Sequence, residues 1–237
     1  MPKPISIDTA KRRWCAHCSV LCASLAVGWA MTAAPLPAHA RASEPAGGAP
    51  TTSATVLVVG DSLSAEYGLA RGTGWVALLT QRLQERQPPV QVINASVSGD
   101  TTAGGRSRLP ALLRTHRPTH VVIELGGNDA LRGLDLRMTE ANLSQMAESA
   151  RQAGARVTVV GMQVPPNYGA AYSRDFIELF ARVAKKHQAA LVPFLLKIVA
   201  DGPHPTALFQ PDRIHPIELA QPLMLAYVWP VLRPQLP

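Results

Sequence analysis

Cysteine is scarce in this chain and is confined to its amino terminus. The three cysteines, Cys15, Cys18 and Cys22, all precede residue 41, so the rest of the sequence contains no thiol. This absence excludes a disulfide, a cysteine nucleophile and a zinc–thiolate site from residues 41–237. That part of the chain must therefore be held together by its core alone.

Charged residues are also few, at 16% of the sequence, whereas hydrophobic residues make up 47%. This composition predicts a globular protein with a sizeable core and argues against a disordered chain. The formal net charge is +7, but the basic residues are scattered rather than blocked. We interpret them as a solvated surface and expect no nucleic-acid partner, with transient contact with an anionic membrane surface left as an alternative.

Two further kinds of pattern are missing. The sequence has no glycine-rich fingerprint of the P-loop or dinucleotide type, and no histidine cluster has the spacing of metal ligands. We therefore predict neither a cofactor nor a metal. Four histidines lack any setting that would suggest chemistry and are interpreted as structural or exposed: His116, His120, His187 and His204.

The first forty residues have the pattern of a secretory signal peptide. Lys11–Arg13 form a positive segment, residues 14–30 are mostly apolar, and Ala38-His-Ala40 is typical of a cleavage site. We predict cleavage near Ala40 and a periplasmic or secreted protein; an uncleaved membrane anchor and a lipoprotein are the alternatives. Residues 41–53 are rich in small residues and proline and are predicted to be a flexible leader.

Strands alternate with helices over residues 54–237, which we predict to be a single domain. The apolar runs predict five strands, at Thr55–Val59, Val90–Ala95, His120–Leu125, Arg156–Gly161 and Ala190–Val192. Helices are expected over about 75–86, 106–116, 139–153, 173–188 and 217–232. This alternation predicts a flavodoxin-like, three-layer α/β fold, with a mostly parallel sheet and helices on both faces.

Three turns that follow strands carry groups suited to one reaction. They are Gly60-Asp-Ser62, Ser98-Gly-Asp100 and Gly126-Gly-Asn-Asp129, and in a parallel sheet they open on the same edge. Together they offer a hydroxyl at Ser62, a backbone N–H at Gly99 and a side-chain amide at Asn128, which are a nucleophile and two donors for an oxyanion. The plainer alternatives are a helix cap at Ser62 and ordinary turn chemistry at the other two.

A carboxylate and an imidazole lie close together near the carboxyl terminus. Asp212 and His215 are three residues apart, and in a helical turn this spacing places both on one face. The order Ser, Asp, His is one of the known orders of a catalytic triad, although the usual Gly-x-Ser-x-Gly elbow is here Gly-x-Ser-x-Ser. The alternative is a surface ion pair of little energetic weight.

Four sequence blocks together resemble the GDSL, or SGNH, hydrolase family. They are Gly-Asp-Ser-Leu-Ser, Asn-Ala-Ser-Val-Ser-Gly-Asp-Thr, Leu-Gly-Gly-Asn-Asp and Asp-Arg-Ile-His-Pro. The chain is most similar to the bacterial periplasmic branch of multifunctional thioesterases, lysophospholipases and arylesterases. The resemblance implies Ser62 as nucleophile, His215 as general base and Asp212 as its orienting carboxylate. It also implies an oxyanion hole formed by the N–H groups of Ser62 and Gly99 and by the side chain of Asn128.

The expected function is that of a secreted, monomeric serine esterase acting through an acyl-enzyme on Ser62. Its expected substrates are short- to medium-chain and aryl esters, extending to acyl thioesters and lysophospholipids. A carbohydrate-acetyl esterase on the same scaffold and a non-catalytic flavodoxin-like binding module are the alternatives. Glu66 departs from the family pattern, because a small residue is expected there. Its carboxylate either alters the pH profile or the charge preference of the site, or simply points to solvent.

Overall fold

The computed structural model describes residues 54–202 and 206–236, which lie within one compact unit, Ala49–Pro237. The predicted signal peptide and leader, residues 1–53, lie outside the described residues, as does His204. Within the described part, no helix is both long enough and apolar enough to cross a bilayer.

A five-stranded parallel sheet forms the middle layer. Its strands are β1 (Thr55–Gly60), β2 (Gln91–Asn94), β3 (His120–Glu124), β4 (Arg156–Val160) and β5 (Ala190–Val192), in the order β2-β1-β3-β4-β5. Every neighbouring pair is parallel, with Val58 of β1 opposite Val122 of β3. All residues of β1 and β3 are buried, as expected for central strands covered on both faces.

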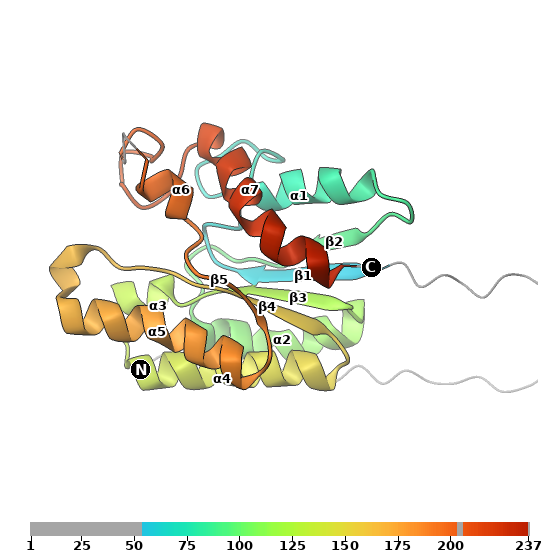
Figure 1. The fold of residues 1–237 in the computed structure, drawn as a ribbon, viewed down its shortest axis with the longest axis horizontal. Helices are drawn as coiled ribbons and strands as arrows, with labels where there is room; N and C mark the ends of the chain where they lie inside the picture. The colour runs from blue at the N-terminus through green and yellow to red at the C-terminus, as the bar shows by residue number, and fades with distance from the viewer. Residues whose placement is uncertain (1–53, 203–205, 237) are drawn as a thin grey trace, which may run out of the picture. The chain divides into compact units, whose positions relative to one another are not determined.

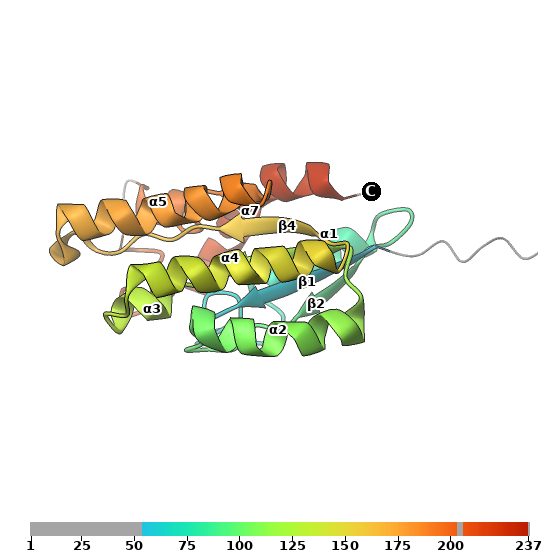
Figure 2. The same ribbon diagram turned by 90° about the horizontal axis from the view of Figure 1, so that it is seen from below.

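Helices cover both faces of the sheet. On one face α1 (Trp75–Gln84) packs against α7 (Gln221–Leu232), and on the other α4 (Leu136–Gln152) packs against both α2 (Thr102–His116) and α5 (Ala170–Lys186). Figures 1 and 2 show these two helical layers on opposite sides of the strands. The predicted three-layer α/β fold is therefore confirmed.

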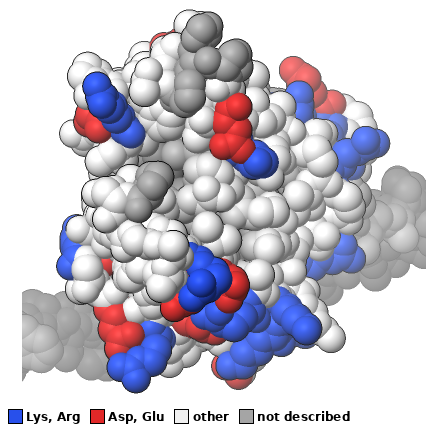
Figure 3. Space-filling view, turned by 60° about the vertical axis from the view of Figure 1, so that its left-hand side comes forward, with Lys and Arg blue, Asp and Glu red and all other residues white. Residues whose placement is uncertain are grey.

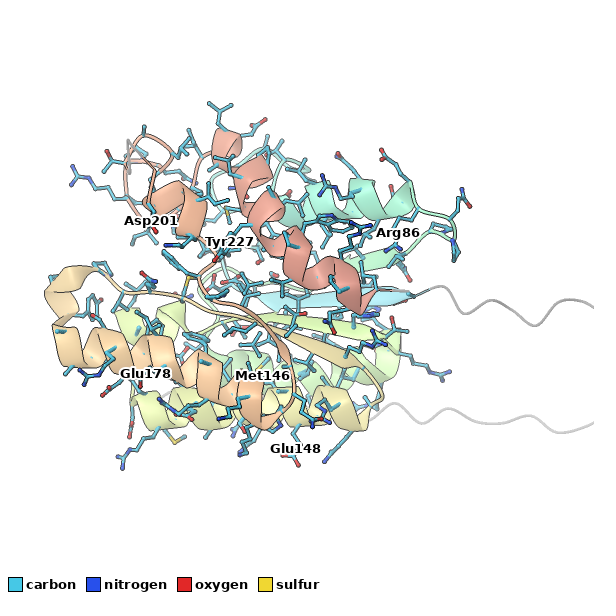
Figure 4. The ribbon with its side chains drawn as sticks, viewed as in Figure 1. Arg86, Met146, Glu148, Glu178, Asp201 and Tyr227 are labelled. Atoms are coloured by element: carbon cyan, nitrogen blue, oxygen red, sulfur yellow. The ribbon has the colours of Figure 1, made fainter. Side chains whose placement is uncertain are left out.

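The helices bury one face each because their apolar residues recur at helical spacing. In α1 the buried residues are Trp75, Val76, Leu79 and Leu83, which form one stripe. Met146 of α4 is buried, whereas Glu148 is exposed and points away from the sheet (Figure 4). The buried apolar residues of both layers belong to one continuous core.

Three helices begin earlier than their sequences suggest, and a side-chain cap marks the start of two of them. Helix α2 starts at Thr102 rather than near residue 106, because the Thr101 hydroxyl accepts the N–H of Gly104. Helix α4 starts at Leu136, with the Asp135 side chain as its cap, rather than near residue 139, where the sequence suggests Thr139 as the cap. Thr139 is instead buried inside the first turns of that helix.

Several short elements were not predicted from the sequence. They are α3 (Gly127–Leu131), α6 (Lys197–Ala200) and two 3-10 turns at Pro166–Tyr168 and Arg233–Gln235. The start of the helix predicted over 217–232 is a third 3-10 turn, Glu218–Ala220, and α7 begins at Gln221. Helix α5 also begins at Ala170 rather than Ser173. Pro222 lies in the first turn of α7, where a proline is tolerated because the missing N–H has no intrahelical acceptor.

Candidate active site

Ser62, His215 and Asp212 form one chain of hydrogen bonds. Ser62 lies two residues beyond the end of β1, and His215 lies between α6 and α7. Nε2 of His215 is 2.8 Å from the Ser62 hydroxyl oxygen, and Nδ1 is 2.7 Å from Oδ2 of Asp212. With a neutral imidazole, the serine hydroxyl donates to Nε2 and the Nδ1–H donates to the carboxylate. The structure thus brings Asp212 and His215 together with Ser62, which lies 153 positions before His215 in the sequence.

The segment that carries the histidine is an irregular turn rather than the helical turn considered from the sequence. Oδ1 of Asp212 accepts the backbone N–H groups of Ile214 at 2.9 Å and His215 at 3.0 Å. This fold of the carboxylate onto its own backbone, a known property of aspartate in turns, brings the two side chains together. Arg213, between them, has a left-handed φ of 58°.

These contacts control the ionisation of Asp212. Partial burial acts to raise its pKa, but the N–H groups of His215 and Ile214 and the imidazole outweigh burial and lower the pKa to about 2. The carboxylate is therefore charged throughout the neutral range, as required of a group that orients and stabilises an imidazolium.

Backbone hydrogen bonds join the two ends of the segment that carries His215. Phe209 and Pro216 form an isolated antiparallel bridge. The N–H of Gln210 donates to the carbonyl of His215 at 2.7 Å, and that of Ile217 donates to the carbonyl of Leu208 at 2.9 Å. Residues 208–217 therefore form a small hairpin with Asp212 at its tip.

The two predicted oxyanion donors lie on the same groove as Ser62. Gly99 and Asn128 line it together with the nucleophile. Gly99 has a φ of 78°, which favours glycine, and its carbonyl accepts a hydrogen bond from Arg132 at 2.7 Å. Asn128 lies in α3 rather than in a simple turn, and its Nδ2 donates to Asp61 Oδ2 at 3.0 Å. That bond fixes the orientation of the amide.

A buried polar cluster contacts the turn that carries Ser62. Glu124 of β3 is fully buried; its Oε2 accepts the N–H of Asp61 at 3.3 Å and the hydroxyl of Ser64 at 2.8 Å. The other oxygen of this carboxyl, Oε1, is buried and has no hydrogen-bond partner among the described residues. A Cβ at residue 60 would lie only 2.7 Å from Oε2, so Gly60 allows the carboxyl to approach the backbone.

Burial shifts both carboxyl groups of this cluster toward the neutral acid. Desolvation, followed by the nearby charge of Asp61, raises the pKa of Glu124 well above its ordinary value. Desolvation likewise raises the pKa of Asp61 to about 6, against the opposing effect of its hydrogen bonds from Leu63 and Asn128. Sequence reasoning missed the role of Asp61 as the acceptor for Asn128. The sequence feature that could have indicated this role is the position of Asp61 in the motif Gly-Asp-Ser, directly before Ser62.

Arg108 is a second residue whose position the sequence did not reveal. Its Nε donates to Asp100 Oδ2 at 2.8 Å, and its guanidinium also donates to the carbonyl groups of Ala95 and Gly60. Arg108 therefore ties the turn after β2 to the end of β1. Its place within a predicted helix gave no signal for this contact.

An apolar groove of about 500 Å³ leads away from the Ser62 hydroxyl. Its apolar lining includes Met162, Val164, Phe194, Leu196, Phe209 and Ile214. Figure 3 brings forward the side of the molecule on which the strands end, and the middle of this face is largely uncharged. Among the described residues, no three histidine, aspartate or glutamate side chains gather in a way that could hold a metal ion.

Glu66 is engaged within its own loop. Its carboxylate accepts the N–H of Gly72 at 3.0 Å and that of Gly74 at 2.9 Å. The carboxylate therefore folds back onto backbone donors rather than simply pointing to solvent. The next residue, Tyr67, places its ring against His215, with ring centroids 4.4 Å apart.

A parallel α/β sheet with a Ser–His–Asp chain at its carboxyl edge, beside an apolar groove, defines a serine hydrolase of acyl groups. Residues 58–221 match the family described as GDSL-like Lipase/Acylhydrolase. The chain belongs to this family.

Named relatives and solved structures are similar over most of the chain. It is 50% identical over 182 residues to Esterase TesA of Pseudomonas aeruginosa, covering 77% of this chain and 89% of that protein. It is 39% identical to thioesterase 1/protease 1/lysophospholipase L1 of Escherichia coli, covering 76% and 84%. The crystal structure of TesA superposes with a TM-score of 0.73 and 50% identity over 77% of this chain and 99% of that one. The psychrotrophic esterase EstA of Pseudoalteromonas, inhibited by monoethylphosphonate, gives 0.71 and 38% over 76% and 97%.

Proposed function

We propose that this serine hydrolase cleaves acyl esters through an acyl-enzyme on Ser62, with the acyl chain in the apolar groove. The observation that carries the proposal is the continuous contact from Asp212 through His215 to Ser62, at 2.7 and 2.8 Å, at the mouth of that groove. Such a chain of contacts lets a hydroxyl lose its proton as it attacks.

The reaction follows from these positions. Ser62 Oγ attacks the ester carbonyl while His215 Nε2 takes its proton, and the charge of Asp212 stabilises the resulting imidazolium. The N–H groups of Ser62 and Gly99 and the amide of Asn128 receive the oxyanion. The imidazolium then protonates the departing alcohol or thiol. Water, activated by the same imidazole, attacks the acyl-enzyme, releases the acid and restores the serine hydroxyl.

The lining of the groove supports a hydrocarbon acyl group as the substrate. Its side chains around Met162, Phe194 and Leu196 are apolar, and an apolar cavity of this size accepts a short or medium chain. The names of the relatives, an esterase, an arylesterase and a thioesterase/lysophospholipase, support esters and extend the proposal to thioesters and lysophospholipids. An acetylated sugar would require polar partners that this lining offers sparingly.

The test is a series of chromogenic esters from acetyl to dodecanoyl, alongside acyl thioesters and an acetylated sugar. We expect kcat/KM to rise from acetyl to medium chains, and Ser62→Ala to lower kcat by about 10⁴- to 10⁶-fold without unfolding the protein. A highest rate on acetylated sugars would support the carbohydrate-acetyl esterase. Substantial turnover by folded Ser62→Ala would refute the nucleophile.

We also propose that the enzyme is exported as a monomer and makes transient contact with lipid surfaces. The signal-like pattern of residues 1–40 supports export. Tyr67, Leu131 and Ile214, which line the groove, are 50%, 48% and 44% exposed and support contact with lipid. Amino-terminal sequencing of exported protein should begin near Arg41, light scattering should give the mass of one chain, and flotation with anionic vesicles should report weak binding.

A further inference from the structure

Tyr67 holds a position that the packing of the core does not explain. The ring is 50% exposed, lines the groove, and lies with its centroid 4.4 Å from that of the His215 imidazole, at an interplanar angle of 38°. A half-exposed aromatic ring contributes little to the core. Its defined contact is therefore with the catalytic base.

The loop that carries Tyr67 is fixed from its own side by Glu66. Glu66 has a left-handed φ of 61°, and its carboxylate accepts the N–H groups of Gly72 and Gly74. These bonds close residues 66–74 into a compact loop. The residue that departs from the family pattern thus shapes the loop directly beside Tyr67.

The histidine hairpin holds the same loop from the other side. Nε2 of Gln210 donates to the carbonyl of Tyr67 at 2.9 Å and to that of Pro216 at 3.3 Å. A Cβ at residue 68 would lie 2.2 Å from Oε1 of Gln210, and Gly68 has a φ of 69°, so both the close approach and the backbone require glycine. One amide side chain therefore joins the tyrosine loop to the hairpin that carries the base.

The chemistry of the site gives this arrangement a consequence. When Ser62 Oγ attacks, its proton moves to Nε2 and His215 becomes a cation; the electron-rich face of an aromatic ring within about 6 Å attracts such a cation. We propose that Tyr67 is a positioning residue, whose ring orients His215 and stabilises its imidazolium, and that Glu66 and Gln210 hold the ring in place. This inference rests on the proposed function, in which His215 accepts the serine proton.

Other charged groups also face the imidazole. Asp212 contacts it from the same hairpin, Asp61 acts on it from the end of β1, and Arg213 lines the same groove. Replacing Tyr67 leaves these three groups in place. A change in the pH dependence of the variant therefore reports the ring.

The primary test compares Tyr67→Leu with Tyr67→Phe on a short ester whose acyl chain is too small to reach along the groove. We expect Tyr67→Leu to lower kcat by about two- to sixfold, the range of a partly exposed cation–π contact, with KM little changed. The acidic limb of its kcat/KM profile should move to lower pH, because the protonated imidazole has lost a stabilising partner. Tyr67→Phe, which keeps the ring, should recover most of the lost kcat.

Three results would overturn the proposal: an unchanged kcat and pH profile in Tyr67→Leu, a loss confined to KM, or a Tyr67→Phe variant as slow as Tyr67→Leu. Ser62→Ala separates this failure from failure of the proposed function. If Ser62→Ala is inactive while Tyr67→Leu is normal, only the role of the ring is refuted. If folded Ser62→Ala is active, the function itself is refuted.

A double-mutant cycle tests the role given to Glu66. Glu66→Ala removes the acceptor of the two glycine N–H groups, and it should lower kcat in the parent enzyme but add nothing in the Tyr67→Leu background, since both changes act through one contact. Gln210→Glu, which keeps the shape but loses the donor, should behave in the same way if Glu66→Ala fails to fold. Equal losses in both backgrounds would show that the loop does not act through Tyr67.

Discussion

The pKa values of carboxyl groups shift in opposite directions at the exposed tip of the histidine hairpin and in the buried cluster next to Ser62. The Asp212 side chain is 37% exposed, yet hydrogen-bond donors lower its pKa to about 2. Glu124 is fully buried and also accepts two hydrogen bonds, yet desolvation raises its pKa well above the ordinary value.

The difference shows that desolvation outweighs two hydrogen bonds at a fully buried carboxyl group. Glu124 has the charge of Asp61 as its neighbour, whereas Asp212 has an imidazole. The exposed group can therefore serve as a permanent anion beside the base. The buried group acts as a neutral support that holds the backbone of Asp61 and the hydroxyl of Ser64.

The largest effect is expected from Asp212→Asn, which replaces the exposed carboxylate. The amide keeps the shape but favours the wrong imidazole tautomer, so we expect kcat to fall by about 10³- to 10⁴-fold with KM little changed. Steady-state kinetics on one ester measures this. A loss of less than about tenfold in a folded variant would mean that another group orients His215.

A smaller effect is expected at Asn128, which adjoins the buried cluster. Its amide contacts Asp61 on one side and lines the groove on the other. Asn128→Ala should lower kcat by about 10²- to 10³-fold, as found when one oxyanion donor is removed. Asn128→Asp should be at least as slow, because a carboxylate repels the oxyanion. A change in KM alone would assign Asn128 to substrate binding.

The smallest expected effect concerns stability, through Glu124→Gln. A carboxyl whose pKa is raised in the folded state favours folding fully below its unfolded pKa, about 4.3. That contribution is lost as the pH rises through the folded pKa. Glutamine cannot ionise, so the melting temperature of Glu124→Gln should decline less than that of the parent protein above about pH 4.

Thermal melts of both proteins across the acidic and neutral range measure this difference. We expect the two curves to separate by a few degrees, since about 1 kcal/mol shifts the melting temperature of a domain of this size by about 2–4 °C. Parallel curves would show that folding does not raise the pKa of Glu124. Glu124→Leu, which leaves Asp61 and Ser64 without an acceptor, is the destabilised comparison.

The sequence was sufficient for the strands and for the convergence of the reactive groups. Parallel strands end at one edge, so Ser62, Gly99 and Asn128 could be placed together before any distance was known. The limits of the helices were less predictable. Helix α2 was predicted to begin near residue 106, but Gly104 and Gly105 lie inside it, where a Cβ at residue 105 would be only 2.3 Å from Leu125. This contact with Leu125, which lies outside the helix, could not be predicted from the sequence of the helix alone.

The contacts that support the site could not be predicted for the same reason. The raised pKa of Glu124 depends on burial that two strands produce together. The turn at Asp212 depends on a left-handed φ at Arg213, which no sequence motif predicts. Glu66 illustrates the limit most clearly. The sequence identified it as unusual, but only the folded loop shows that its carboxylate accepts N–H groups six and eight residues further along.

The bridge between Phe209 and Pro216 has a consequence for how this enzyme can diversify. Because residues 208–217 are clasped at their base by backbone bonds, the geometry of Asp212 and His215 depends on the hairpin rather than on the length of chain that leads to it. Insertions or deletions just before the clasp can therefore be absorbed without displacing the base. Variation in that stretch is a route by which the rim of the groove can change while the reaction is kept.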